Sequence, residues 1–149
     1  MSDRDEKKKM NYQKPPFWDA VFNPKSISII GKTDKFKGGA MFINSLINFG
    51  YKGKISVVST DNEGSHGFDS FDKIEGLPDG IDYAILAIPA SKIPNAIRKL
   101  GEKGVRVAHI FSSGFGDLET EEGRALEEDL KMTGIECGIR IIGPNCLER

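Results

Sequence analysis

The chain has 149 residues, of which 38% are hydrophobic and 29% charged, with 21 basic and 22 acidic side chains. This composition suits one globular domain, and the formal net charge of −1 gives no overall field that favours nucleic acid or a membrane surface. Cys137 and Cys146 lack metal-site spacing, so we expect reduced thiols in a cytoplasmic protein.

The first residues carry charges of both signs without an apolar period, which predicts a disordered tail over residues 1–14. A single folded domain is expected over 15–149. It begins with a short helix around Trp18, Val21 and Phe22, whose apolar side is expected to dock on a sheet.

Short apolar runs, each ending in a turn of glycine, proline or small residues, follow one another along the chain and predict five strands. They cover residues 26–30, 54–58, 82–88, 105–111 and 138–142. Helical stretches are predicted between them at 39–48, 71–74, 90–103 and 121–132. This alternation indicates an α/β protein with a Rossmann-like, doubly wound, parallel five-stranded sheet.

Apolar spacing also predicts which side of each helix faces the sheet. The predicted inner residues are Phe42, Ile43, Leu46, Ile47 and Phe49 for the first of these helices, and Leu126 and Leu130 for the last.

The loop after the first strand combines glycines with three lysines. Its residues of interest are Gly31, Lys32, Lys35, Lys37, Gly38 and Gly39. Glycine lets backbone N–H groups approach an anion, and a helix N-terminus adds partial positive charge, so the loop predicts a phosphate or pyrophosphate site. It lacks the spacing of a dinucleotide fingerprint or a P-loop. The alternative is a glycine-rich turn before a helix, with solvated lysines.

Two further turns follow the third and fourth strands, at Pro89 and at Ser112–Ser113–Gly114. Both could border a crevice that holds a long ligand across the strand ends. Pro89 could equally be a proline that starts a helix. Asp61 comes 30 residues after Gly31, later than the acidic residue of NAD-binding domains, so we expect a loop residue there.

The histidines and cysteines do not form a recognisable catalytic set of the Ser-His-Asp or Cys-His type. His109 lies within an apolar strand and is expected to be an interior histidine, whereas His66 lies in a polar loop. Cys146 has no evident partner base. We therefore assign no catalytic residue and no metal ligand.

Several of these segments together resemble a known family, most specifically the run Arg-Ile-Ile-Gly-Pro-Asn-Cys-Leu at 140–147 and the run Phe-Asn-Pro-Lys-Ser-Ile-Ser-Ile-Ile-Gly at 22–31. They are similar to the CoA-binding domain of NDP-forming acyl-CoA synthetases, which include ADP-forming acetate–CoA ligases and, more distantly, the α subunit of succinyl-CoA synthetase. The resemblance spans residues 17–147.

The resemblance implies that the ligand is coenzyme A. It implies phosphate contacts from Gly31, Lys32, Thr33, Lys37 and Gly39, contacts to the pantetheine arm from Pro89, Ser112, Ser113 and Gly114, and a closing turn at Asn145. Ser59 is also expected to bind the ligand. The family commonly has Asn-Pro-Lys at this place, whereas this chain has Ser59-Thr60-Asp61, so an acid replaces a lysine.

The resemblance also implies a role. The domain would position the CoA thiol for acyl transfer, as the N-terminal module of a longer ligase, beside phosphohistidine and ATP-grasp domains or subunits. Those modules do not fit within 149 residues, so binding without turnover is expected of this chain alone. The alternatives are a stand-alone CoA- or nucleotide-sensing or protein-interaction domain and, third, a fragment of an NAD(P)-dependent enzyme. No nucleic-acid or membrane partner is expected.

Overall fold

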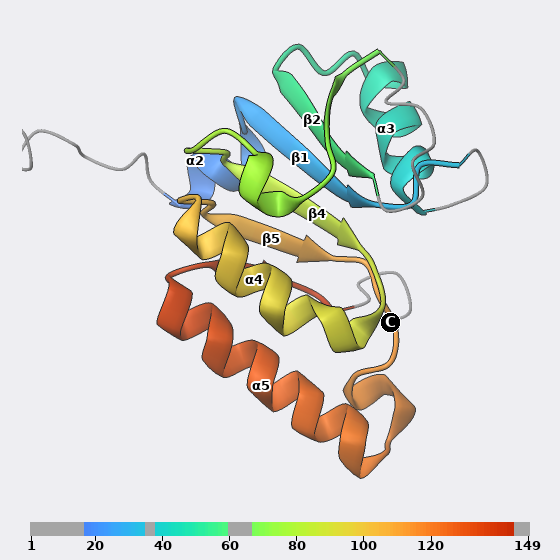
Figure 1. The fold of residues 1–149 in the computed structure, drawn as a ribbon, viewed down its shortest axis with the longest axis vertical. Coiled ribbons are helices and arrows are strands. Elements are labelled where there is room, and N and C mark those ends of the chain that lie inside the picture. Colours follow the sequence, from blue (N-terminus) through green and yellow to red (C-terminus); the bar gives the residue numbers. More distant parts are fainter. Residues whose placement is uncertain (1–16, 35–37, 60–66, 145–149) are drawn as a thin grey trace, which may run out of the picture.

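A computed structural model describes residues 17–34, 38–59 and 67–144, and six parallel strands form one sheet within them (Figure 1). The strand order is β3-β2-β1-β4-β5-β6, a doubly wound Rossmann-like arrangement. The strands are β1 (Ser26–Gly31), β2 (Lys54–Ser59), β3 (Asp69–Phe71), β4 (Tyr83–Ala87), β5 (Val107–Ile110) and β6 (Arg140–Ile142). The predicted tail, 1–14, lies outside the described residues.

The predicted number of strands was wrong: the described sheet has six, not five. The missed strand, β3, has three residues and pairs with β2 through Ser56 and Asp69. It contains no apolar run, because it lies at the sheet edge and none of its residues is fully buried. The helical turn predicted at 71–74 is shifted to a 3₁₀ turn, Ile74–Gly76.

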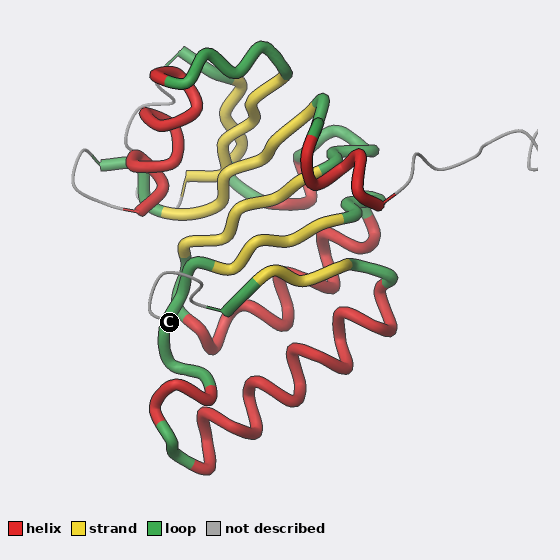
Figure 2. The backbone as a smooth tube through the Cα atoms, turned by 180° about the vertical axis from the view of Figure 1, so that it is seen from behind, coloured by secondary structure: helices red, strands yellow, loops and turns green. Residues whose placement is uncertain are grey.

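The helices cover both faces of the sheet (Figures 1 and 2). One face carries α2 (Phe17–Phe22) and α3 (Gly38–Asn48), and the other carries α4 (Ile93–Glu102) and α5 (Glu121–Cys137). Because both faces are covered, the central strands are nearly continuous apolar runs rather than alternating ones. Ile29 and Val57 pack with Ile43 of α3, whereas Ile30 and Leu86 join the cluster under α4 and α5.

Helix ends differ from the predicted positions for identifiable reasons. The helix predicted from residue 90 begins as a separate 3₁₀ turn, Ala90–Lys92, before α4. The last helix, α5, continues five residues past the predicted end and stops at Gly138, whose φ of 66° is the left-handed conformation that glycine tolerates after a helix. The strand β6 is shorter as a result.

Not all predicted inner residues are buried. Leu130 is buried and Leu126 packs against the same cluster, as predicted. In the helix α2, however, the buried residue is Ala20. Trp18 and Phe22 are 63% and 79% exposed, and their rings stack on each other. Ile47 and Phe49 are also exposed, because α3 buries only the stripe around Ala40 and Ile43.

Among residues 17–34, 38–59 and 67–144, no helix has the length and apolar character that crossing a membrane requires.

Truncation of the central strand tests the core. Leu86 is fully buried in β4, so Leu86→Ala should lower the free energy of unfolding by about 3 kcal/mol, from lost apolar burial and the cavity left behind. The matched control Ile135→Ala, at a side chain 74% exposed on α5, should change it by less than about 0.5 kcal/mol. Urea unfolding measures both, and equal losses would contradict the assigned core.

Candidate functional site

The carboxyl ends of the parallel strands lie along one edge of the sheet, where ligands bind in open α/β folds. The chain moves outward from β1 to β2 on one side and resumes with β4 on the other, so the order reverses between β1 and β4. Gly31 ends β1 and is in register with Ala87 at the end of β4 and with Ser59 at the end of β2. This is the point at which a crevice is expected.

Backbone packs closely against backbone at that point. A Cβ added to Gly31 would lie 2.6 Å from the carbonyl oxygen of Ala87, and one added to Gly38 would lie 3.1 Å from the Ala87 Cβ and 3.7 Å from the Phe111 ring. The ends of β1, β4 and β5 and the start of α3 therefore meet around two glycines. We call this meeting point the glycine junction.

The start of α3 is held by its own loop. The Gly39 N–H donates to the Lys32 carbonyl oxygen at 3.1 Å, and a Cβ on Gly39 would lie 2.5 Å from that oxygen. Glycine is thus required for the close approach. The turn directs the N-terminus of α3, with its partial positive charge, toward the strand ends.

A pair of hydroxyl groups ties this loop to the next strand. Thr33 is 1% exposed, and its Oγ1 lies 3.1 Å from the Oγ of Ser59 at the end of β2. The structure therefore brings together Gly31, Thr33, Gly39 and Ser59, while the Lys32 side chain is exposed. Lys35, Lys37 and Asn145, also predicted to bind ligand, lie outside the described residues.

The loops after β4 and β5 are fastened to each other. The Ser112 hydroxyl donates to the Ile88 carbonyl oxygen at 2.5 Å, so this side chain bridges the two strand ends. A Cβ on Gly114 would lie 3.2 Å from the Ala90 Cβ. Ser113 is exposed. Pro89 directly precedes the 3₁₀ turn Ala90–Lys92, the position of a proline that starts a helix.

Comparison with known proteins identifies the family. The CoA binding domain family matches residues 25–148. The chain belongs to this family. It is 39% identical over 132 residues to the acetate–CoA ligase [ADP-forming] I subunit alpha of Pyrococcus furiosus, covering 85% of this chain and 28% of that subunit. It is 35% identical over 131 residues to a trans-feruloyl-CoA synthase from an unknown prokaryotic organism, covering 87% of this chain and 18% of the synthase.

A solved structure has the same fold. The dinucleotide-forming acetyl-coenzyme A synthetase 1 of Ca. Korarchaeum cryptofilum, in complex with phosphate and ADP, superposes with a TM-score of 0.78 at 30% identity, over 85% of this chain and 27% of that one. The chain thus spans less than a third of the length of these relatives and resembles the α-subunit region of ADP-forming acetyl-CoA synthetases.

Sequence reasoning missed one residue of this CoA-binding domain's strand-end loops. The Asp117 carboxylate accepts hydrogen bonds from the Phe115 N–H at 2.8 Å and from the Gly114 N–H at 3.2 Å. An Asp three residues after a glycine in a short polar turn is a recognisable signal, because Asp side chains often bond to nearby backbone N–H groups.

His109 is an interior residue rather than part of the crevice. It is half-buried on the α3 side of β5, with its Nδ1 3.0 Å from the Tyr83 hydroxyl and the Phe42 ring packed edge-on against it. Burial lowers the pKa of His109 below 6.5, because the charged ring is poorly solvated there. Within the described part of the chain, no three His, Cys, Asp or Glu side chains are placed to hold a metal ion.

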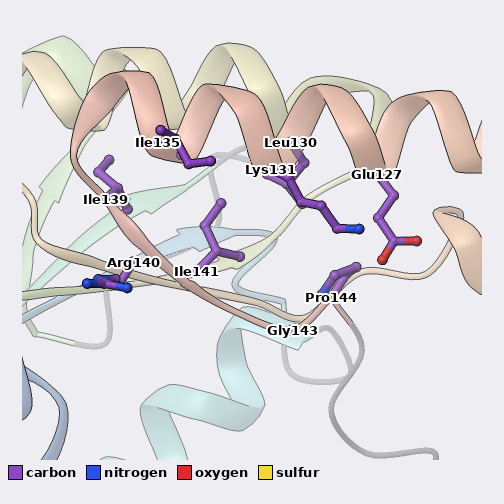
Figure 3. A pocket seen from close by; sticks show the side chains of 10 residues that line it. Glu127, Leu130, Lys131, Ile135, Ile139, Arg140, Ile141, Gly143 and Pro144 are labelled. Atoms are coloured by element: carbon purple, nitrogen blue, oxygen red, sulfur yellow. The ribbon is translucent and has the colours of Figure 1, made fainter.

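A hollow of about 370 Å³ lies away from the glycine junction, between α5 and the edge strand β6 (Figure 3). Ile135, Ile139 and Ile141 line it, with Glu127 and Lys131 near Pro144 at one end. Its walls are mainly aliphatic, and it lies on the α5 side of the sheet rather than the α3 side. For that reason we do not assign the CoA phosphates to it.

The half-buried histidine His109 predicts a pH dependence of stability. The pKa of His109 is lower in the folded chain than in the unfolded chain, so the unfolded chain takes up its proton first as pH falls. This contribution is complete above about pH 6.5 and is lost as the pH falls from 6.5 through the lower folded pKa. Unfolding free energies measured from pH 8 to 5 should fall more steeply for the wild type than for His109→Gln.

Superimposable profiles for the wild type and His109→Gln would show that burial of His109 does not penalise its charge.

Proposed function

We propose that coenzyme A binds in a crevice along the carboxyl ends of β1, β4 and β5, beside the glycine junction, and that the domain presents the CoA thiol for acyl transfer. The observation that carries the proposal is the convergence of Gly31, Gly38 and Gly39 with the ends of β1 and β4, in a chain whose family binds CoA. The close packing of these glycines brings the N-terminus of α3, with its partial positive charge, to the ends of β1 and β4, which favours an anionic ligand beside it.

The phosphates are placed at the β1–α3 side of the crevice. The N-terminus of α3 supplies partial positive charge there, and Lys32 adds an exposed cation. Lys35 and Lys37 belong to the same loop and are proposed to contribute as well. Thr33 and Ser59 hold the loop against the end of β2.

The pantetheine arm is placed across the ends of β4 and β5. Pro89, Ser113 and Gly114 would border it, and Ser112 would act by tying the two loops together rather than by direct contact. Asn145 would close the site near the thiol end. An uncharged, amide-bearing arm suits the loop after β5, because its residues 111–120 include no lysine or arginine.

The domain would contribute to acyl transfer by positioning, because holding a thiol near its reaction partner removes much of the entropic barrier. We propose that further ligase domains or subunits, of the phosphohistidine and ATP-grasp type, form the acyl phosphate, in keeping with relatives more than three times as long as this chain. A cytoplasmic location is proposed, and the free thiol of Cys137 fits it.

Calorimetric titration tests the proposal. The wild type should bind CoA, and Lys32→Ala should weaken CoA binding about five- to tenfold, or about 1–1.4 kcal/mol, because a charged contact to phosphate is lost. Binding of pantetheine, which carries no phosphate, should be unchanged by the same substitution.

Asn44→Ala is the matched control, because Asn44 is an exposed residue of α3 itself. It should leave CoA binding at the wild-type level. Absence of binding by folded wild type at millimolar CoA would overturn the proposed function, and equal weakening of CoA and pantetheine by Lys32→Ala would overturn the phosphate placement.

A further inference from the structure

The loop that joins β5 to α5, residues 111–120, is held in place at three points. The Ser112 hydroxyl bonds to the Ile88 carbonyl oxygen, the Phe115 ring is fully buried under α4 and α5, and Asp117 bonds to the backbone within the loop. Ser113 and Gly114 lie between the first two points. The tip of the loop, Ser113–Gly114, is therefore short and is held on both sides, by Ser112 and by Phe115.

Asp117 sets the direction of the backbone at this tip. Its Oδ1 accepts from the Phe115 N–H at 2.8 Å and from the Gly114 N–H at 3.2 Å, and its Oδ2 lies 3.3 Å from the Gly114 nitrogen. Gly114 has a φ of 106°, which side chains other than glycine rarely adopt. Without Asp117 these two N–H groups would lose their partner, and the only internal bond left at Phe115 would be the one its carbonyl oxygen accepts from the Leu118 N–H at 3.2 Å.

The same contact decides what the loop can bind. Successive backbone N–H groups that point to one spot form a site for anions, as in many phosphate-binding loops. Here a carboxylate of the chain already fills that spot. The β5 loop therefore has no free N–H pair at Gly114 and Phe115 to offer a phosphate, and it carries a negative charge of its own.

We infer that Asp117 is a positioning residue that holds the Ser113–Gly114 tip against the uncharged arm of the ligand and directs the phosphates to the β1–α3 loop instead. The inference rests on the proposed CoA site. According to this inference, the proposed site has two halves. A cationic half at Lys32 and Gly39 contacts the phosphates, and the half at Gly114 contacts only the neutral arm.

Binding of three ligands tests the two halves of the site separately: CoA, pantetheine and adenosine 3′,5′-bisphosphate. Asp117→Ala should weaken CoA and pantetheine about tenfold each, because both contain the arm. It should not weaken adenosine 3′,5′-bisphosphate, which lacks the arm. Asp117→Asn keeps an acceptor oxygen and should restore most of the pantetheine affinity. Glu136→Ala, which removes an exposed carboxylate farther along α5, should change none of the three.

A loop readout accompanies the titrations. Amide hydrogen exchange at Phe115 should be faster in Asp117→Ala and close to wild type in Asp117→Asn, while the exchange of buried strand amides stays unchanged in both. Slow exchange at Phe115 in Asp117→Ala would overturn the positioning role, whatever the affinities.

The outcomes separate this inference from the function on which it rests. If wild type binds no CoA, the proposed function fails. If wild type binds CoA and Asp117→Ala binds CoA and pantetheine equally well, or loses adenosine 3′,5′-bisphosphate as much as pantetheine, the inference alone fails.

Discussion

The candidate site depends on direct backbone contact where β1 ends. Gly31 lies so close to Ala87 that a side chain at that position would force the ends of β1 and β4 apart. Gly38 and Gly39 bring α3 down onto the same point with equally little room. Because no side chains separate these segments, the N-terminus of α3 lies directly beside the ends of β1 and β4. The remainder of the fold, a sheet packed on both faces, holds these segments rigidly enough for that contact to persist.

The two sides of the proposed CoA site are built differently. Side-chain hydroxyls at Thr33 and Ser59 brace the cationic side, where the loop is glycine-rich. On the other side, Ser112 and Asp117 use their polar atoms to fasten the loops after β4 and β5. A ligand with phosphates at one end and amides along the rest matches this division. A symmetric dinucleotide, with its charge in the middle, matches it less well.

Much of this could be predicted from the sequence, because buried strands and glycine turns leave strong local signals. The segments that form β1, β2 and β4 are apolar because both faces of the sheet are covered. Gly31 and Gly39 indicate that two backbone segments approach each other closely. The strand β3 could not be predicted, because its pairing with β2 depends on tertiary contact and not on apolar side chains. The exposure of Trp18 and Phe22 was missed for a similar reason: periodicity shows which side of a helix is apolar, but not whether a partner covers it. The bond from the Ser112 hydroxyl to the Ile88 carbonyl oxygen could not be predicted either, because it joins residues 24 apart that only the fold brings together.

Backbone amide chemical shifts recorded during a titration with CoA test the central claim most directly. Binding at the glycine junction predicts the largest shifts at Gly31, Gly39 and Gly114, with little change at Gly50 and Gly104, which follow the C-terminal ends of α3 and α4, away from the strand ends. Saturable shifts confined to Glu127, Ile135 and Ile141, around the hollow between α5 and β6, would contradict the account, because CoA would then occupy a different face of the domain.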